Sequence, residues 1–167
     1  MLAQHGVPAL GELSNALRYA MACPALPTCG LAVSDAERAL PAVVREIEAE
    51  LARLGLQDEK MSIRMTGCPN GCVRPYLGDI GFVGRTLNAY NVYLGGDLEG
   101  TRLNWLYAEM VPTDKLVQTL VPPLELYKHR RQPSERFGDF CHRIGVDALL
   151  QMVPAAASAG RRPVRRA

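Results

Sequence analysis

The sequence predicts a single α+β domain in which helices flank a small mixed or antiparallel sheet. Helical periodicity occupies the two ends of the chain, whereas residues 60–96 hold short runs of β-branched and aromatic residues separated by Gly or Asn. The length of 167 residues, with 48% hydrophobic and 22% charged residues, suits one globular core. Helices on either side of a short run of strands are typical of the α+β class.

The first predicted element is a helix over residues 10–22. Leucines recur along it at the spacing that places side chains on one helical face: Leu10, Leu13 and Leu17. The first pair of cysteines follows directly, in CPALPTCG, where two prolines and a glycine end the regular structure.

The second predicted helix spans residues 34–55 and has the strongest pattern in the sequence. Ser34 and Glu37 form the S-x-x-E pattern of a capping box, in which each side chain satisfies a backbone donor of the first turn. Pro41 is expected to kink this helix or to restart it. Apolar residues then form a stripe that ends at a glycine stop: Val44, Ile47, Leu51, Leu54 and Gly55.

Three strands are predicted next, over residues 60–66, 79–84 and 90–96. Their sequences are KMSIRMT, DIGFVG and YNVYLGG, each short and rich in residues that suit a pleated, half-buried surface. The second pair of cysteines lies between the first two strands, in GCPNGC.

Helical character returns at the end of the predicted domain, which covers residues 1–150. A helix over residues 112–131 is expected to be interrupted by Pro122 and Pro123. A last short helix is predicted within residues 134–145, ending at a glycine. Residues 151–167 are predicted to form a disordered basic tail.

The charge distribution argues against nucleic acid as a partner. The formal net charge is +2, but four of the 19 Lys and Arg residues lie in the last seven positions, which leaves 15 of them against 17 Asp and Glu in residues 1–160. No apolar run approaches the roughly 18 residues needed to cross a bilayer, and the chain begins without the pattern of a secretory signal. The sequence therefore predicts no membrane partner and a cytoplasmic, reducing location.

Five cysteines are present, and four of them are arranged differently from the fifth. Cys141 stands alone and is interpreted as a small buried apolar group. The others form two pairs, Cys23 with Cys29 and Cys68 with Cys72, in the patterns C-x5-C and C-x3-C. Pro and Gly around each pair draw the backbone out of regular structure, so that thiolates and amide N–H groups can converge on one point.

The residues alone leave three interpretations of these four thiols open. Disulfides are disfavoured, because a chain of this size in a reducing compartment does not need them. Zinc sites usually use C-x2–4-C pairs, a pattern that C-x3-C fits and C-x5-C exceeds. An iron–sulfur cluster has iron corners several ångströms apart, so it accepts wider and unequal spacings. The pattern favours a cluster over zinc, and a purely structural role for both pairs remains the third interpretation.

The chain resembles the C-terminal region of the siroheme-dependent nitrite and sulfite reductases, in particular the assimilatory sulfite reductase hemoproteins. Four segments in order, spread over residues 15–147, carry the resemblance: MACPALPTCGLAVSDAER, IRMTGCPNGCVRPYLGDIGFVG, YNVYLGGDLEGTRLN and ERFGDFCHRIG. It implies the fold of the family's 4Fe-4S domain, and it implies that this chain corresponds to the C-terminal part of a longer enzyme.

The resemblance also implies two cofactors, a [4Fe–4S] cluster and a siroheme. By position, Cys23, Cys29, Cys68 and Cys72 would ligate the cluster, and Cys72 would also be the axial ligand of the siroheme iron. The implied activity is the six-electron reduction of sulfite to sulfide. CPALPTC and CPNGC favour sulfite over nitrite, and a nitrite reductase fragment is an alternative; so are a cluster-only electron-transfer module and a non-catalytic zinc or structural domain.

Siroheme carries eight carboxylates, which directs attention to the basic residues near the second cysteine pair. Arg64 and Arg74 are candidate partners, because a guanidinium meets a carboxylate in a two-pronged geometry. Asn70 is a candidate for hydrogen bonding near the cluster sulfurs or for shaping the turn.

The family's substrate-binding residues come largely from upstream domains, so no catalytic residue can be named. The implied partners are the remaining N-terminal region of a sulfite reductase, sulfite, and an electron donor that is an NADPH-dependent flavoprotein or a ferredoxin. GGDLEGTR favours the form that is partnered by the flavoprotein. The isolated chain is expected to be inactive.

Overall fold

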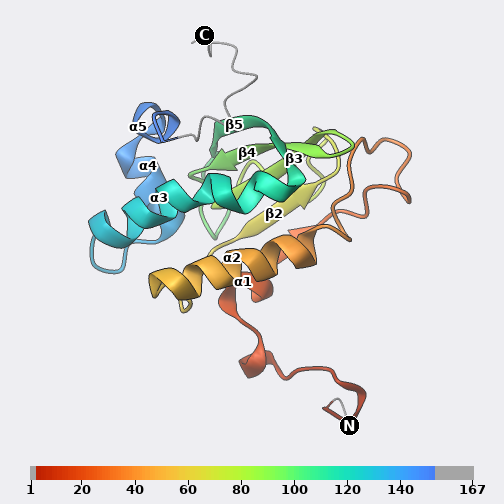
Figure 1. The fold of residues 1–167 in the computed structure, drawn as a ribbon, viewed down its shortest axis with the longest axis horizontal. Coiled ribbons are helices and arrows are strands. Elements are labelled where there is room, and N and C mark those ends of the chain that lie inside the picture. The colour runs from red at the N-terminus through yellow and green to blue at the C-terminus, as the bar shows by residue number, and fades with distance from the viewer. Residues whose placement is uncertain (1–2, 153–167) are drawn as a thin grey trace.

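The computed structural model describes residues 3–152 and contains a five-stranded sheet in the order β1-β2-β3-β4-β5 (Figure 1). The strands are β1 (Ala20–Ala22), β2 (Ile63–Thr66), β3 (Ile80–Thr86), β4 (Ala89–Leu94) and β5 (Trp105–Pro112). The first three strands run parallel, and β4 and β5 continue the sheet antiparallel. The mixed sheet with flanking helices confirms the predicted α+β class.

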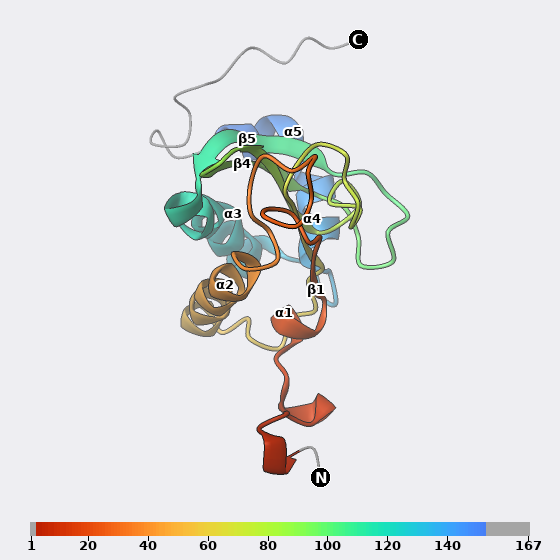
Figure 2. The same cartoon turned by 90° about the vertical axis from the view of Figure 1, so that its right-hand side faces the viewer.

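Two long helices, α2 (Leu40–Leu54) and α3 (Leu116–Arg130), lie side by side and cover one face of the sheet (Figures 1 and 2). Helix α2 contacts β1, and α3 contacts β5. The shorter helices are α1 (Asn15–Arg18), α4 (Phe137–Ile144) and α5 (Val146–Leu150), and single 3-10 turns occur at Ala3–His5, Leu10–Glu12 and Thr113–Lys115.

The core lies between the two long helices and the sheet. The predicted apolar stripe of α2 is confirmed, since Val44, Ile47, Leu51 and Leu54 are all buried. Gly55 ends this helix in the left-handed conformation, as the sequence predicted. Fully buried aromatic side chains from β3, β4, α3 and α4 complete the core: Phe82, Tyr90, Tyr127, Phe137 and Phe140.

The three parallel strands require two crossover connections, and these differ in kind. The first, from β1 to β2, contains α2. The second, from β2 to β3, is residues 67–79, which return from one end of the sheet to the other without a helix. The second cysteine pair lies in this helix-free crossover.

The predicted first helix over residues 10–22 is wrong in most of its length. Only residues 15–18 are α-helical, and residues 20–22 form β1, paired in parallel with β2. Tertiary pairing with β2 overrides a local leucine pattern here, because three residues of strand give no period that the sequence could display.

The predicted capping box at Ser34 is also wrong, because α2 begins at Leu40. Pro41 lies in its first turn, so the restart that was expected there is the actual start of the helix. Ser34 is fully buried, and its hydroxyl donates to the carbonyl of Thr86 at the end of β3. Its side chain therefore joins the first cysteine segment to the sheet.

The prediction that Pro122 and Pro123 interrupt their helix is wrong, since α3 runs through both residues. The last predicted helix is confirmed as α4, which ends before Gly145, and the short α5 follows it. No helix in residues 3–152 is long and apolar enough to cross a membrane. The predicted disordered tail, residues 151–167, lies outside the described residues except for its first two positions.

Candidate functional site

The two cysteine pairs leave the sheet at the same edge, where β1 and β2 end. The parallel register pairs Ala22 with Met65, so Cys23 follows one strand just where the neighbouring strand reaches its last residue. Cys68 lies two residues beyond that end. In Figure 1 the loop after β1 extends past the arrowhead of β2, at the right-hand end of the molecule.

Backbone hydrogen bonds join the two cysteine segments. The amide of Cys23 donates to the carbonyl of Met65 over 3.1 Å. Farther along the first segment, the amides of Val33 and Ser34 both donate to the carbonyl of Gly67, over 2.9 and 3.0 Å. The first cysteine loop, residues 23–34, is thus attached at its start to the end of β2 and at its end to Gly67, the first residue of the second cysteine loop, residues 67–79.

Gly67 is the point of closest approach between these loops. Its amide donates to the sulfur of Cys23 over 3.3 Å, a contact of the kind that orients a metal-binding side chain. A Cβ at this position would lie 2.6 Å from the Cβ of Ala25 and 2.6 Å from the carbonyl oxygen of Ser34. The two loops can meet here only because residue 67 has no side chain.

The four thiols are free and differ in exposure. Cys23 and Cys68 are buried, Cys29 is half-buried and Cys72 is exposed. The structure brings Cys23 against the turn that carries Cys68. Among residues 3–152, no three His, Cys, Asp or Glu side chains lie close enough together to hold a single metal ion. Convergence of all four thiols therefore stays a prediction.

Tyr76 shapes the second cysteine loop from inside. Its hydroxyl donates to the carbonyl of Pro69 over 3.0 Å, and its ring packs edge-on against Tyr93 with centroids 5.1 Å apart. The amide of Arg74 donates to the carbonyl of Gly71 over 2.7 Å, which closes a turn directly around Cys72. The loop around the C-x3-C pair is therefore a defined structure.

The predicted anion-binding arginines lie near each other. Arg64 is half-buried in β2, and its guanidinium contacts the sulfur of Met21 over 3.3 Å. Burial lowers the pKa of Arg64, and the positive charge of Arg74 lowers it further. Arg74 and Asn70 are exposed. The two arginines together form a positive surface beside the second cysteine loop, and an anion there would relieve their repulsion.

Two buried polar residues, Asp79 and Asn104, support this loop and were missed from the sequence. Asp79 is fully buried; its carboxylate accepts from the amide and hydroxyl of Ser62 over 2.8 and 2.6 Å and from the amide of Gly138 over 3.0 Å. Burial raises the pKa of Asp79, an effect that these hydrogen bonds partly offset. For Asp79, the sequence did offer a signal, because it is an acidic residue at the start of an apolar strand.

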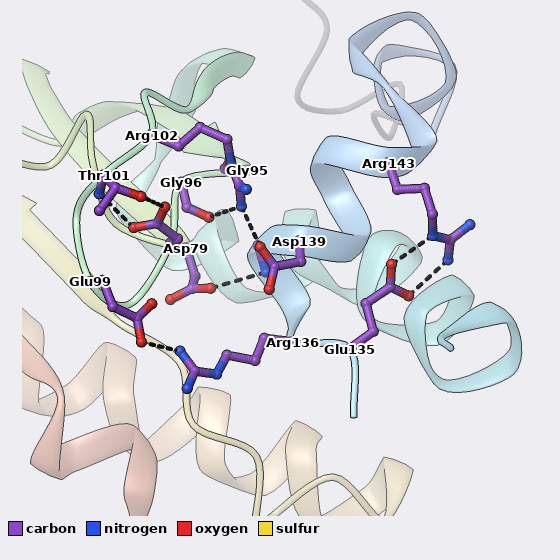
Figure 3. Close-up of polar contacts among 12 residues, drawn as sticks. Asp79, Gly95, Gly96, Glu99, Thr101, Arg102, Glu135, Arg136, Asp139 and Arg143 are labelled. Atoms are coloured by element: carbon purple, nitrogen blue, oxygen red, sulfur yellow. Dashed lines mark hydrogen bonds and ion pairs between the residues drawn. The ribbon is translucent and has the colours of Figure 1, made fainter. Parts of the chain in front are cut away.

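A polar network connects the segment after β4, residues 95–104, to α4 (Figure 3). Arg102 donates to the carbonyls of Gly95 and Gly96 over 2.9 and 3.0 Å and pairs with Asp139 over 2.7 Å. Arg136 pairs with Glu99 of the same segment over 2.6 Å. These contacts fix the segment that carries Asn104.

Cys141 takes no part in the cysteine loops. It lies in α4 and is fully buried in the hydrophobic core. Burial raises its pKa well above the usual value for a thiol, which favours the uncharged form. This environment suits a small apolar group.

Comparison with known proteins identifies the family. Residues 14–159 match the family described as the nitrite and sulphite reductase 4Fe-4S domain. The sulfite reductase [NADPH] hemoprotein beta-component of Methylobacterium nodulans is 55% identical over 131 residues, which are 78% of this chain and 22% of that protein. The sulfite reductase [ferredoxin] of Synechococcus elongatus is 46% identical over 151 residues, 90% of this chain and 24% of that protein.

Solved structures share the fold. The structure of the NirA protein of Mycobacterium tuberculosis superposes with a TM-score of 0.70 at 24% identity, covering 88% of this chain and 29% of that one. Dissimilatory sulfite reductase I superposes with a TM-score of 0.57 at 12% identity, covering 89% of this chain and 56% of that one. The chain spans about a quarter of the length of the curated relatives it matches. The chain belongs to the nitrite and sulphite reductase 4Fe-4S domain family.

Proposed function

We propose that this chain is the redox domain of an assimilatory sulfite reductase, which binds a [4Fe–4S] cluster and a siroheme. The observation that carries the proposal is the meeting of the two cysteine loops at the carboxyl edge of β1 and β2, where Gly67 hydrogen-bonds Cys23. The family match and the sulfite reductase relatives support the same assignment.

The donor set fits the cluster. Four thiolates are the soft ligands that iron–sulfur clusters use. In the proposal Cys23, Cys29, Cys68 and Cys72 hold the cluster, and Cys72 also ligates the siroheme iron. When bound, the coupled cofactors supply electrons singly to substrate at the heme. The chain supplies the thiolates, the amide of Gly67 that orients Cys23, and the turn that presents Cys72.

A cluster fits this arrangement better than zinc does. A structural zinc ion holds four ligands tetrahedrally, with Zn–S distances of about 2.3 Å, so its sulfurs must gather closely. The C-x3-C pair fits the short spacing that such a site uses, and the C-x5-C pair exceeds it. A cube with iron at four corners accepts wider and unequal spacings.

The positive surface beside the second cysteine loop is assigned to the siroheme carboxylates. The charge of Arg74 lowers the pKa of Arg64, and a bound carboxylate would offset this repulsion. Asn70, exposed in the same loop, is assigned to the turn that presents Cys72.

The substrate and partners belong to the whole enzyme and extend the proposal. The substrate is sulfite, reduced to sulfide with six electrons. The electron donor is an NADPH-dependent flavoprotein or a ferredoxin, the two classes that the names of the relatives print. The isolated chain is expected to be inactive until it is joined to the remaining region of the enzyme. A cytoplasmic location is part of the proposal, because a reducing compartment keeps the thiols free.

Anaerobic reconstitution of the chain with iron and sulfide tests the proposal. The wild-type chain should take up about four irons and show the broad brown absorbance of a [4Fe–4S] cluster. Cys72→Ala should lose most of this absorbance, whereas Cys141→Ala, which removes the thiol outside the site, should keep it. A colourless chain that binds one zinc ion, or an unchanged spectrum in the Cys72 variant, would refute the assignment.

A further inference from the structure

Asn104 contacts the second cysteine loop more extensively than its position in the sequence suggests. It is the last residue of the segment that follows β4, and 9% of its surface is exposed. Its backbone amide donates to the carbonyl of Tyr76 over 2.8 Å. Its side-chain Nδ2 donates to the carbonyls of Pro75 and Gly78 over 2.7 and 3.0 Å. One residue therefore holds three carbonyls of the loop.

These three carbonyls belong to the arm of the loop that follows Cys72 and Arg74. An amide is the chemistry suited to this task, because its two N–H groups can donate to two carbonyls at once. The side-chain oxygen of Asn104 is buried, and no residue in the described part of the chain donates to it. The amide is thus oriented by the loop, and its acceptor is left unpaired.

This arm, residues 75–78, also packs directly against β3. A Cβ at Gly81 in β3 would overlap the carbonyl of Pro75, so the loop lies directly on the strand. The Nδ2 of Asn104 lies beside this contact, 3.2 Å from the same Cβ position, and donates to the same carbonyl. Residues 75–78 are therefore held both by their contact with β3 and by the amide of Asn104.

The segment that carries Asn104 is itself held in place by polar contacts. Two residues before it, Arg102 ties the segment to the carbonyls of Gly95 and Gly96 and to Asp139 of α4 (Figure 3). The segment is therefore bonded to α4 through Arg102 and, two residues later, to the loop that bears Cys72 through Asn104.

We propose that Asn104 is a positioning residue for Cys72: by fixing residues 75–78 against β3, its amide sets where Cys72 and Arg74 stand relative to the cofactors. This inference rests on the proposed function, because it concerns the cysteine that is assigned to both metal centres. Asn104 touches neither the thiol nor the guanidinium and acts only through the loop. Such outer contacts typically govern metal affinity by about 10- to 100-fold when they are removed.

The test compares reconstituted chains that carry Asn104→Ala, Asn104→Asp or Asn91→Ala. The Asp variant keeps the volume but turns an oxygen toward two carbonyls. Asn91 is the matched control, since it is 5% exposed and its Oδ1 accepts from the amide of Met110 between β4 and β5. Iron loss to an excess of chelator and the electron paramagnetic resonance spectrum of the reduced cluster are measured beside the thermal midpoint.

Both Asn104 variants should release iron about tenfold faster than wild type and show an altered resonance spectrum. Asn91→Ala should lower the thermal midpoint without changing either cluster property. Equal iron release in Asn104→Ala and Asn91→Ala would overturn the inference, and so would failure of both Asn104 variants to fold, which would assign the residue to general stability. A wild-type chain that assembles no cluster would instead refute the proposed function.

Discussion

At the scale of single residues, the buried carboxyl group of Asp79 determines how β2, β3 and α4 are held together. It receives three hydrogen bonds, two from Ser62 and one from Gly138 at the start of α4. Burial raises its pKa above the ordinary value of 3.8, so the folded state favours the protonated form more than the unfolded chain does. Stability must therefore depend on pH through this group.

We expect Asp79→Asn to be less stable than wild type by about 1–3 kcal/mol, because the NH2 group of the asparagine would face the donors of Ser62 and Gly138 where a carboxylate oxygen accepts from them. The contribution of a group with a raised folded-state pKa is complete below the unfolded value and is lost as the pH rises through the folded-state pKa. The gap between wild type and variant should thus shrink over the window that begins near 3.8 and extends upward.

Urea denaturation at a series of pH values measures this gap. Asp114→Asn is a suitable control, because the Asp114 side chain is 74% exposed and pairs with Lys115 only at 3.8 Å. A gap of constant size across the window would show that Asp79 ionises equally easily in both states, contrary to the effect of its burial.

Site residues could be predicted where their spacing in the sequence carries information. They could not be predicted where their role depends only on partners that the fold brings close. The C-x5-C and C-x3-C patterns single out four cysteines without any coordinates. Asn104 has no such pattern, since its partners at Pro75 and Gly78 lie in another loop. The fold alone brings them together.

At the scale of elements, α3 shows how an interior proline can be accommodated. Pro123 has no N–H to donate to the carbonyl of Thr119, four residues earlier. The hydroxyl of Tyr107, which projects from β5, donates to that carbonyl over 3.2 Å. Of the two helical hydrogen bonds that Pro122 and Pro123 remove, the one to Thr119 is thus replaced by a bond from the sheet, which contributes to the continuity of α3 where the sequence predicted an interruption.

Tyr107→Phe should therefore destabilise the chain by about 1–3 kcal/mol, because the buried carbonyl of Thr119 would have no partner. Pro123→Ala restores the helical N–H, so adding Tyr107→Phe to this variant should cost less. A double-mutant cycle by chemical denaturation gives the coupling energy. Strictly additive costs would mean that the tyrosine hydroxyl does not compensate for the proline.

The elements that sequence reasoning identified are those with enough length to show a period. The apolar stripe of α2, from Val44 to Leu54, covers about three turns and was predicted correctly. Strand β1 has three residues and depends on β2 for its existence. At Ser34 the error is a false positive. The capping pattern is present in the sequence, but the Ser34 hydroxyl donates to the carbonyl of Thr86 and caps no helix.

At the scale of the whole molecule, the two ends of the sheet have different construction. One end carries the two cysteine loops, which are held mainly by backbone hydrogen bonds and by close approach at Gly67. At the other, α3, α4 and α5 pack on one another and on β5, around Tyr127, Phe137 and Phe140. The apolar core should hold its shape without any cofactor, whereas the cysteine loops should not.

Cofactor loading should consequently slow hydrogen exchange only in residues 23–34 and 67–79. If the cluster is supplied about 100-fold above its dissociation constant, exchange through local opening of these loops should slow about a hundredfold. Amides of α3 and α4 should be unaffected. Mass spectrometry of the reconstituted and metal-free chains measures the exchange of both regions at once. Equal protection of the loops and of α3 and α4 would contradict the proposed difference between the cysteine loops and the apolar core.

The architecture as a whole was predictable at the level of class and not of topology. Helical patterns on either side of a short run of strand patterns indicate α+β, and the mixed sheet agrees. The pairing of β1 with β2 joins segments that are distant in sequence, with Ala20 opposite Ile63. No local pattern encodes such partners, because they are chosen by packing against α2 and α3.

The helix-free crossover from β2 to β3 makes metal binding and chain topology inseparable. Residues 67–79 must run back along the strands so that β3 can start beside the beginning of β2, and their number is close to the dozen or so residues that a parallel connection needs. If the turn with Cys68 and Cys72 were excised, the shortened link could join these strands only as a hairpin, with β3 reversed. Descendants of this sequence could thus abandon the thiols by substitution, yet deleting the turn itself would dismantle the parallel half of the sheet.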